Sequence, residues 1–171
     1  PSLSTGPVTV LTPKAQPQHA SAKQHQTGKA SLTGSGLRSQ ADFRVRGRAL
    51  VTDVPITYLG YVNRDSGVIE EPGHPLDGVA IEDTVLVYPK GSGSTVAPYV
   101  LMGLIYTGKG PKAVVNRDIC PLTLPACSLL GVPYGHGFDN DPCLAVNTGD
   151  TVEFRRTPDG VVLEVVERVQ P

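Results

Sequence analysis

The residues of this 171-residue chain that could do chemistry gather in one short loop, Lys90-Gly91-Ser92-Gly93-Ser94-Thr95. The loop follows a compact apolar run, Asp83–Tyr88, and precedes an apolar segment that starts at Val96. This order predicts a buried strand that passes through a Gly-rich turn into a helix. Unpaired N–H groups and a partial positive charge at such a helix start favour a bound anion, and glycine lets a ligand approach the backbone closely. The same donors favour the ionised form of a serine hydroxyl.

The loop also admits plainer interpretations. A Gly-Ser-Gly turn before a helix is often only a turn with a hydroxyl cap. The nucleotide-binding P-loop places Gly-Lys-Ser/Thr after a longer spacer, whereas Lys90 precedes the glycines here. The G-x-S-x-G elbow of hydrolases is absent, because no serine of the loop has Gly two residues to each side. On the residues alone, an anion-binding loop and a capped turn both remain open.

The elements that must position this loop are short. The segment Ser94–Tyr106 is the best helix candidate, with Ser94 or Thr95 as N-cap, Pro98 in the first turn and Gly108 as terminator. Its apolar residues surround the helix, so we expect it to be well buried. Further strands are expected at Phe43–Val51, Gly67–Glu70 and Ala113–Asn116, with a short helix in Pro121–Leu130 and a hairpin from Thr151–Arg156 and Val161–Arg168.

Composition favours one strand-rich α+β domain preceded by an arm. The 19 Gly and 16 Pro among 171 residues favour short strands and many turns over long helices. No Asp or Glu precedes Asp42, and the first 41 residues are basic, polar and rich in Ser and Gln. We therefore predict a flexible or partner-bound N-terminal arm at 1–41 and a folded domain at 42–171.

The overall charge and the cysteines limit the classes of partner. A net charge of −1 gives no electrostatic reason to expect nucleic acid, and no apolar run is long enough to span a membrane. Cys120, Cys127 and Cys143 lack metal-ligand spacing, so we interpret them as buried structural thiols of a reducing, cytoplasmic compartment. The acid-free start also has the composition of an organelle transit peptide, but it has few hydrophobic residues for an amphipathic helix.

Several motifs in consistent order resemble the small subunit of aconitase X enzymes. The resemblance covers about residues 45–135 and implies a swivelling β/β/α domain with a strand-rich, barrel-like core and few helices. The matching motifs are Gly47–Ile56, Leu59-Gly60, Gly67–Ile69, Gly73–Leu76, Gly91–Tyr99 and Gly110–Asn116.

The resemblance also implies a role for the loop. Ser94 would be the catalytic base of a hydro-lyase, and Gly91, Ser92, Gly93 and Thr95 would bind the substrate. A large subunit, rather than this chain, would hold an iron–sulfur cluster, and the small subunit would be inactive without it. The substrate would be a small hydroxy acid, with no metal bound by this chain.

The chain departs from ordinary aconitases at one position of the loop, and the resemblance implies two possible substrates. Ordinary aconitases carry an arginine just after the paired hydroxyl residues, where this chain has Val96, which argues against citrate or isocitrate. The family acts on cis-3-hydroxy-L-proline or on mevalonate 5-phosphate, and the long arm leads us to expect the first.

The alternative to an enzyme subunit is a non-enzymatic module whose loop binds an anionic group on another protein. His74 and Asn63 lie in turn sequences and are expected to serve those turns, whereas His136, between Gly135 and Gly137, could line a mobile loop.

Overall fold

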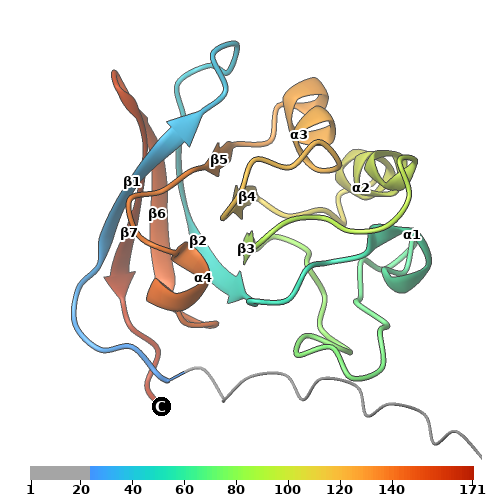
Figure 1. The fold of residues 1–171 in the computed structure, drawn as a ribbon, viewed down its shortest axis with the longest axis horizontal. Helices are drawn as coiled ribbons and strands as arrows, with labels where there is room; N and C mark the ends of the chain where they lie inside the picture. Colours follow the sequence, from blue (N-terminus) through green and yellow to red (C-terminus); the bar gives the residue numbers. More distant parts are fainter. Residues whose placement is uncertain (1–23) are drawn as a thin grey trace, which may run out of the picture.

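The computed structural model describes residues 24–171, and these residues fold around a closed barrel of seven strands (Figure 1). The order around the barrel is β1-β5-β4-β3-β2-β6-β7. The strands are β1 (Ser31–Gly36), β2 (Arg44–Val51), β3 (Val85–Tyr88), β4 (Ala113–Asn116), β5 (Tyr134–His136), β6 (Thr151–Thr157) and β7 (Gly160–Glu167). The helices are α1 (Tyr58–Tyr61), α2 (Ala97–Tyr106), α3 (Leu124–Leu130) and α4 (Pro142–Ala145).

The barrel has a parallel half and an antiparallel half. Strands β2 to β5 pair in parallel, whereas β6, β7 and β1 complete the circle with antiparallel pairs. Helices α1, α2 and α3 lie together on the side of the parallel strands (Figure 1). None of the helices in residues 24–171 combines the length and the apolar character needed to cross a membrane.

Alternation along β3 explains why every one of its residues is buried. Val85 and Val87 belong to the core cluster that contains Phe154 of the antiparallel wall. Leu86 and Tyr88 belong instead to the cluster that contains the α2 side chains. A parallel strand with both faces covered in this way reads as a continuous apolar run. The predicted fold class, an α+β swivelling β/β/α domain with few helices, is confirmed.

The predicted elements agree with the observed ones at the last strands and differ at two places. Ala113–Asn116 and the C-terminal hairpin are found as strands β4, β6 and β7. Helix α2 begins at Ala97 rather than at Ser94. The expected strand at Gly67–Glu70 is reduced to isolated bridges, because this segment pairs only at single positions with its neighbours.

Strand β1 corrects the predicted boundary at residue 41. Residues 31–36 pair with β7 and β5 and close the barrel, so they are part of the folded domain. The strand escapes sequence analysis because of its small residues: a Cβ on Gly34 would lie 2.7 Å from the Phe138 ring, and one on Gly36 would lie 2.8 Å from Val161. The predicted arm residues 1–23 lie outside the described residues.

A buried ion pair fastens the C-terminal end of β7 to the barrel. Asp150 has a fully buried side chain and Arg168 one that is 15% exposed, with Nη1 donating to Oδ2 at 2.8 Å. The backbone N–H groups of Asn147 and Val169 also donate to this carboxylate, each at 2.8 Å. Arg168 also donates to the carbonyl of Gly28, so the segment that leads into β1 is held at the same place.

Candidate functional site

The loop that carries the predicted base leaves the carboxyl end of β3. Strands β3, β4 and β5 are parallel, so their carboxyl ends meet at one edge of the barrel. Beyond β3 the chain stays extended beside Ile56, whose N–H donates to the Lys90 carbonyl at 3.2 Å and whose carbonyl accepts from the Ser92 N–H at 2.9 Å. Gly93 then turns the chain with a φ of +96°, and a Cβ there would lie 3.1 Å from Thr57 Cγ2. Glycine is therefore required where the loop reverses.

Ser94 is exposed and lies in the turn that leads into α2. Its Oγ accepts a hydrogen bond from the Val96 N–H at 3.3 Å, and its carbonyl accepts one from the Ala97 N–H at 3.0 Å. The N-cap of α2 is Val96, which makes no side-chain cap hydrogen bond. The expectation that Ser94 or Thr95 caps the helix is therefore wrong, because Ser94 forms a separate turn that begins two residues before the N-cap. Its hydroxyl oxygen is left at the surface with one N–H donor directed at it.

Three successive backbone donors accompany this hydroxyl. Among residues 24–171, no group accepts a hydrogen bond from the N–H of Gly93, Ser94 or Thr95. All three residues are exposed, so these donors are open to a ligand. They lie just before a ten-residue helix, whose dipole places a partial positive charge at that end. The structure thus places the predicted residues Ser94, Gly93 and Thr95 together at one exposed corner with three open N–H groups.

Gly91 and Ser92 lie deeper than the rest of the loop. Gly91 is buried, and its N–H donates to Cys120 Sγ at 3.2 Å. Ser92 is half-buried, and its N–H is already used by Ile56. These two residues therefore anchor the loop, while the open donors belong to the next three.

A buried polar network lies beneath the loop. Tyr88 Oη is 2.6 Å from Tyr58 Oη and 2.9 Å from Thr123 Oγ1, and Tyr134 Oη donates to Asn116 Oδ1 at 2.8 Å. Burial raises the pKa of Tyr58, Tyr88 and Tyr134, so all three phenols stay protonated at neutral pH. Sequence analysis did not identify this network, because its members are spread over three strands, helix α1 and one loop and carry no local motif.

The turns at His74 and Asn63 behave as their sequences predict, whereas His136 lies in strand β5 rather than in a mobile loop. His74 is buried, with Nε2 3.1 Å from the Pro55 carbonyl and Nδ1 accepting from the Leu76 N–H at 3.0 Å. Asn63 Oδ1 accepts from the N–H groups of Asp65 and Ser66, which closes a local turn. Both side chains are used inside the fold.

The cysteines do not form a metal site. Cys120, Cys127 and Cys143 are all buried and outside disulfides. Burial raises the pKa of Cys127 to about 12, which keeps this thiol protonated. Within residues 24–171, no group of three or more His, Cys, Asp or Glu side chains is placed to hold a metal ion. The side chains of the described part of this chain therefore do not fit an iron–sulfur cluster.

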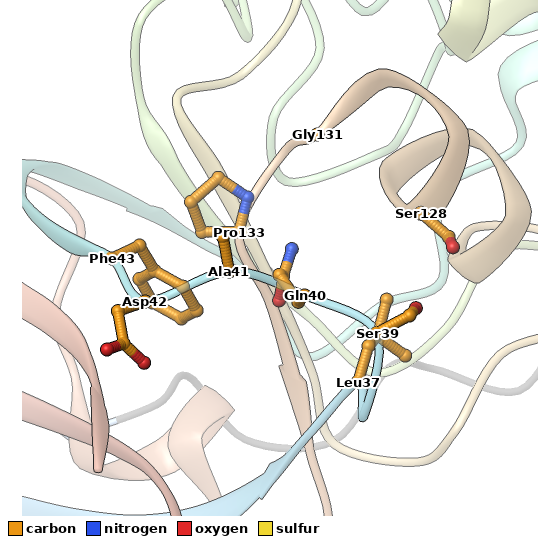
Figure 2. A pocket seen from close by; sticks show the side chains of 9 residues that line it. All are labelled: Leu37, Ser39, Gln40, Ala41, Asp42, Phe43, Ser128, Gly131 and Pro133. Atoms are coloured by element: carbon orange, nitrogen blue, oxygen red, sulfur yellow. The ribbon is translucent and has the colours of Figure 1, made fainter.

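A hollow at the opposite edge of the barrel is not part of this site. It has a volume of about 180 Å³ and lies where the β1–β2 connection passes the end of α3 (Figure 2). Gln40, one of its lining residues, already donates to the Val132 carbonyl at 2.7 Å and accepts from the Tyr134 N–H at 3.3 Å. The hollow adjoins the start of β5, whereas the Gly91–Thr95 loop follows the end of β3. Its lining residues are Leu37, Ser39, Gln40, Ala41, Asp42, Phe43, Ser128, Gly131 and Pro133.

Comparison with known proteins supports the resemblance seen in the sequence. Residues 36–163 match the family described as the aconitase X swivel domain. The phosphomevalonate dehydratase small subunit of Pyrococcus abyssi is 37% identical over 108 residues, which are 63% of this chain and 81% of that protein. The corresponding small subunit of Methanocella arvoryzae is 36% identical over 109 residues, 64% of this chain and 83% of that protein.

A solved structure agrees with the fold. The crystal structure of holo aconitase X from Thermococcus kodakaraensis superposes with a TM-score of 0.70 at 25% identity, over 81% of this chain and 99% of that chain. The barrel with few helices, the family match and the small-subunit relatives lead to the same conclusion. The chain belongs to the aconitase X swivel-domain family and is the small subunit of an aconitase X-like hydro-lyase.

Proposed function

We propose that this chain is the small subunit of a phosphomevalonate dehydratase and supplies Ser94 as the base that removes a proton from mevalonate 5-phosphate. The observation that carries the proposal is the exposed Ser94 hydroxyl beside three open N–H donors, on a chain whose relatives are named for that enzyme. The sequence led us to expect cis-3-hydroxy-L-proline, but the relatives favour the alternative substrate. A doubly anionic phosphate also suits the positive end of α2.

The loop divides its donors between base and substrate. The Val96 N–H donates to Ser94 Oγ and thereby favours the alkoxide. The N–H groups of Gly93, Ser94 and Thr95 hold an oxyanion of the substrate, a phosphate or carboxylate oxygen. Gly91 and Ser92 fix the loop on the barrel, so that hydroxyl and substrate meet in one orientation.

The proposed step removes water from adjacent carbon atoms. Ser94 takes the proton from the carbon next to the substrate carboxylate, and the electrons of that C–H bond form the double bond. The hydroxyl on the neighbouring carbon leaves as hydroxide, and the proton held by Ser94 passes to solvent and restores the alkoxide. The products are an unsaturated acid and water, as a hydro-lyase requires.

The exposure of Ser94 explains why a partner is needed. In bulk water the alkoxide of a serine is a rare species, and a dry pocket is required to make it an effective base. In the free chain Ser94 is open to solvent. A large subunit that covers the loop would exclude water and complete the pocket. Any iron–sulfur cluster would belong to that subunit.

The test combines this chain with its large subunit and follows the loss of each substrate. We expect turnover of mevalonate 5-phosphate, and expect Ser94→Ala to lower kcat about 10²- to 10⁴-fold, the usual contribution of a positioned base, without loss of assembly. Ser128→Ala, another exposed serine, is the matched control and should leave kcat unchanged.

Each other outcome contradicts a defined part of the proposal. Full turnover by Ser94→Ala refutes the base. Turnover of cis-3-hydroxy-L-proline without turnover of mevalonate 5-phosphate refutes the substrate. Assembly without turnover of any hydroxy acid refutes the enzyme and favours the anion-binding module.

A further inference from the structure

We propose that Cys120 is a positioning residue for the Ser94 loop, which it holds through the backbone of Gly91. This inference rests on the proposed role of Ser94. It assigns a function to a buried cysteine that belongs to no recognisable sequence motif. Cys120 would not touch the substrate. It would determine where the loop leaves the barrel and therefore where the Ser94 hydroxyl lies.

Gly91 is held from two sides at once. On one side, Ile56 is hydrogen-bonded to both neighbours of Gly91: its N–H donates to the Lys90 carbonyl at 3.2 Å, and its carbonyl accepts from the Ser92 N–H at 2.9 Å. On the other side, Cys120 Sγ accepts the Gly91 N–H at 3.2 Å and lies 4.0 Å from the Gly91 carbonyl oxygen. In a sheet, the N–H of an extended residue would donate to the backbone of a neighbouring strand. Here Cys120 Sγ is the acceptor for the buried Gly91 N–H instead.

The contact is close because Gly91 has no side chain. A Cβ at this position would lie 3.2 Å from Thr123 Oγ1, 3.4 Å from Leu122 Cβ and 3.5 Å from Cys120 Sγ. The backbone of the loop therefore lies directly on the Cys120–Thr123 turn. Any change in that turn is transmitted to the loop three residues before Ser94.

The turn itself is fixed by the network beneath it. The Cys120 N–H donates to Tyr134 Oη at 3.3 Å, and Tyr134 is bonded in turn to Asn116 at the end of β4. Asn116 Nδ2 donates to the Tyr88 carbonyl at 3.3 Å, at the end of β3. Cys120 is therefore connected to the carboxyl ends of β3 and β4 and to the first residue of β5, which makes it a rigid support for the loop.

The chain offers a matched control for the thiol. Cys127 is also fully buried and lies in the adjacent helix α3, but no hydrogen bond connects its sulfur to the loop among the described residues. Cys120→Val removes the acceptor and adds about one methyl group. Cys120→Ser keeps an acceptor, and Cys127→Val makes the same apolar change seven positions away.

The experiment measures the loop directly and then its effect on turnover. In the full small-subunit chain, we expect hydrogen exchange at the Gly91 amide to be slow in the wild type and in Cys127→Val, and to accelerate in Cys120→Val. With the large subunit added, kcat for mevalonate 5-phosphate should fall about 10- to 100-fold in Cys120→Val with little change in KM, because a misplaced base affects the transition state more than binding. Cys120→Ser should recover part of the lost kcat.

The outcomes separate this inference from the proposed function. If Ser94→Ala abolishes turnover while Cys120→Val keeps wild-type kcat and slow Gly91 exchange, the positioning role is refuted and the base stands. Equal losses in Cys120→Val and Cys127→Val would also refute it, because they would reflect core packing alone. If Ser94→Ala keeps full turnover, the proposed function fails, and accelerated Gly91 exchange in Cys120→Val would still support the contact.

Discussion

Removal of Arg168 should reveal how strongly the barrel depends on its C-terminal ion pair. Arg168→Ala deletes the Nη1 bonds to Asp150 Oδ2 and to the Ala145 carbonyl, both at 2.8 Å, and the Nε bond to the Gly28 carbonyl at 2.7 Å. Asp150 stays fully buried, with only its two backbone donors left. The substitution therefore leaves a carboxylate in the interior with incomplete compensation.

The expected loss follows from this geometry. Breaking a buried pair by removing one partner costs about 3–5 kcal/mol, and the two remaining backbone donors put Asp150 near the lower end, at about 3 kcal/mol. At about 2–4 °C per kcal/mol for a chain of this size, Tm should fall by roughly 6–12 °C. Arg44→Ala is the control: that side chain is 72% exposed in its pair with Glu153, so its loss should be below about 1 kcal/mol.

Urea and thermal unfolding of the full chain can measure both variants. The double variant Asp150→Asn with Arg168→Ala should recover part of the lost stability, because it removes the uncompensated charge. A loss for Arg168→Ala no larger than that for Arg44→Ala would refute the reasoning. So would a double variant that is less stable than Arg168→Ala alone.

Two further predictions concern the edge that carries the loop. Gly91→Ala should lower the free energy of unfolding by about 1 kcal/mol and reduce kcat at unchanged assembly, since its Cβ would lie 3.2 Å from Thr123 Oγ1, closer than ordinary van der Waals contact. Gly103→Ala, whose Cβ would have nothing within 4 Å, should not destabilise the chain, and equal losses in both variants would contradict this prediction. Burial lowers the pKa of His136 below its ordinary 6.5, so the unfolded chain binds the proton first and stability should fall as pH drops below about 6.5. His136→Gln should remove that component, and an NMR titration midpoint of His136 at or above 6.5 would contradict it.

The part of the fold that sequence analysis predicted is the part with a clear hydrophobic pattern. The run at Ala113–Asn116 is a strand with every residue buried, and the Pro158–Gly160 turn joins two alternating segments. Strand β1 was not predicted, because only Leu32 is buried in it and its glycines are required by packing against other strands. Such a requirement is visible only in three dimensions.

The candidate site depends on the sequence in a similar way. The Gly-Ser loop stands out because its residues are contiguous, and the family resemblance implies Ser94 as the base within it, a role that stays a prediction. The contact between Gly91 and Cys120 joins positions 29 residues apart, and a cysteine that accepts a backbone N–H has no sequence signature. Sequence analysis therefore assigned Cys120 only a general structural role.

The closure of the barrel limits how a second chain can attach to this one. Each of the seven strands of the described residues has a neighbour on both sides, so no row of unpaired backbone groups is left for strand addition. A partner must instead recognise loops, helices and side chains. Attachment of that kind leaves the hydrogen bonding of the barrel intact, which lets the domain turn or detach as a rigid body and return unchanged.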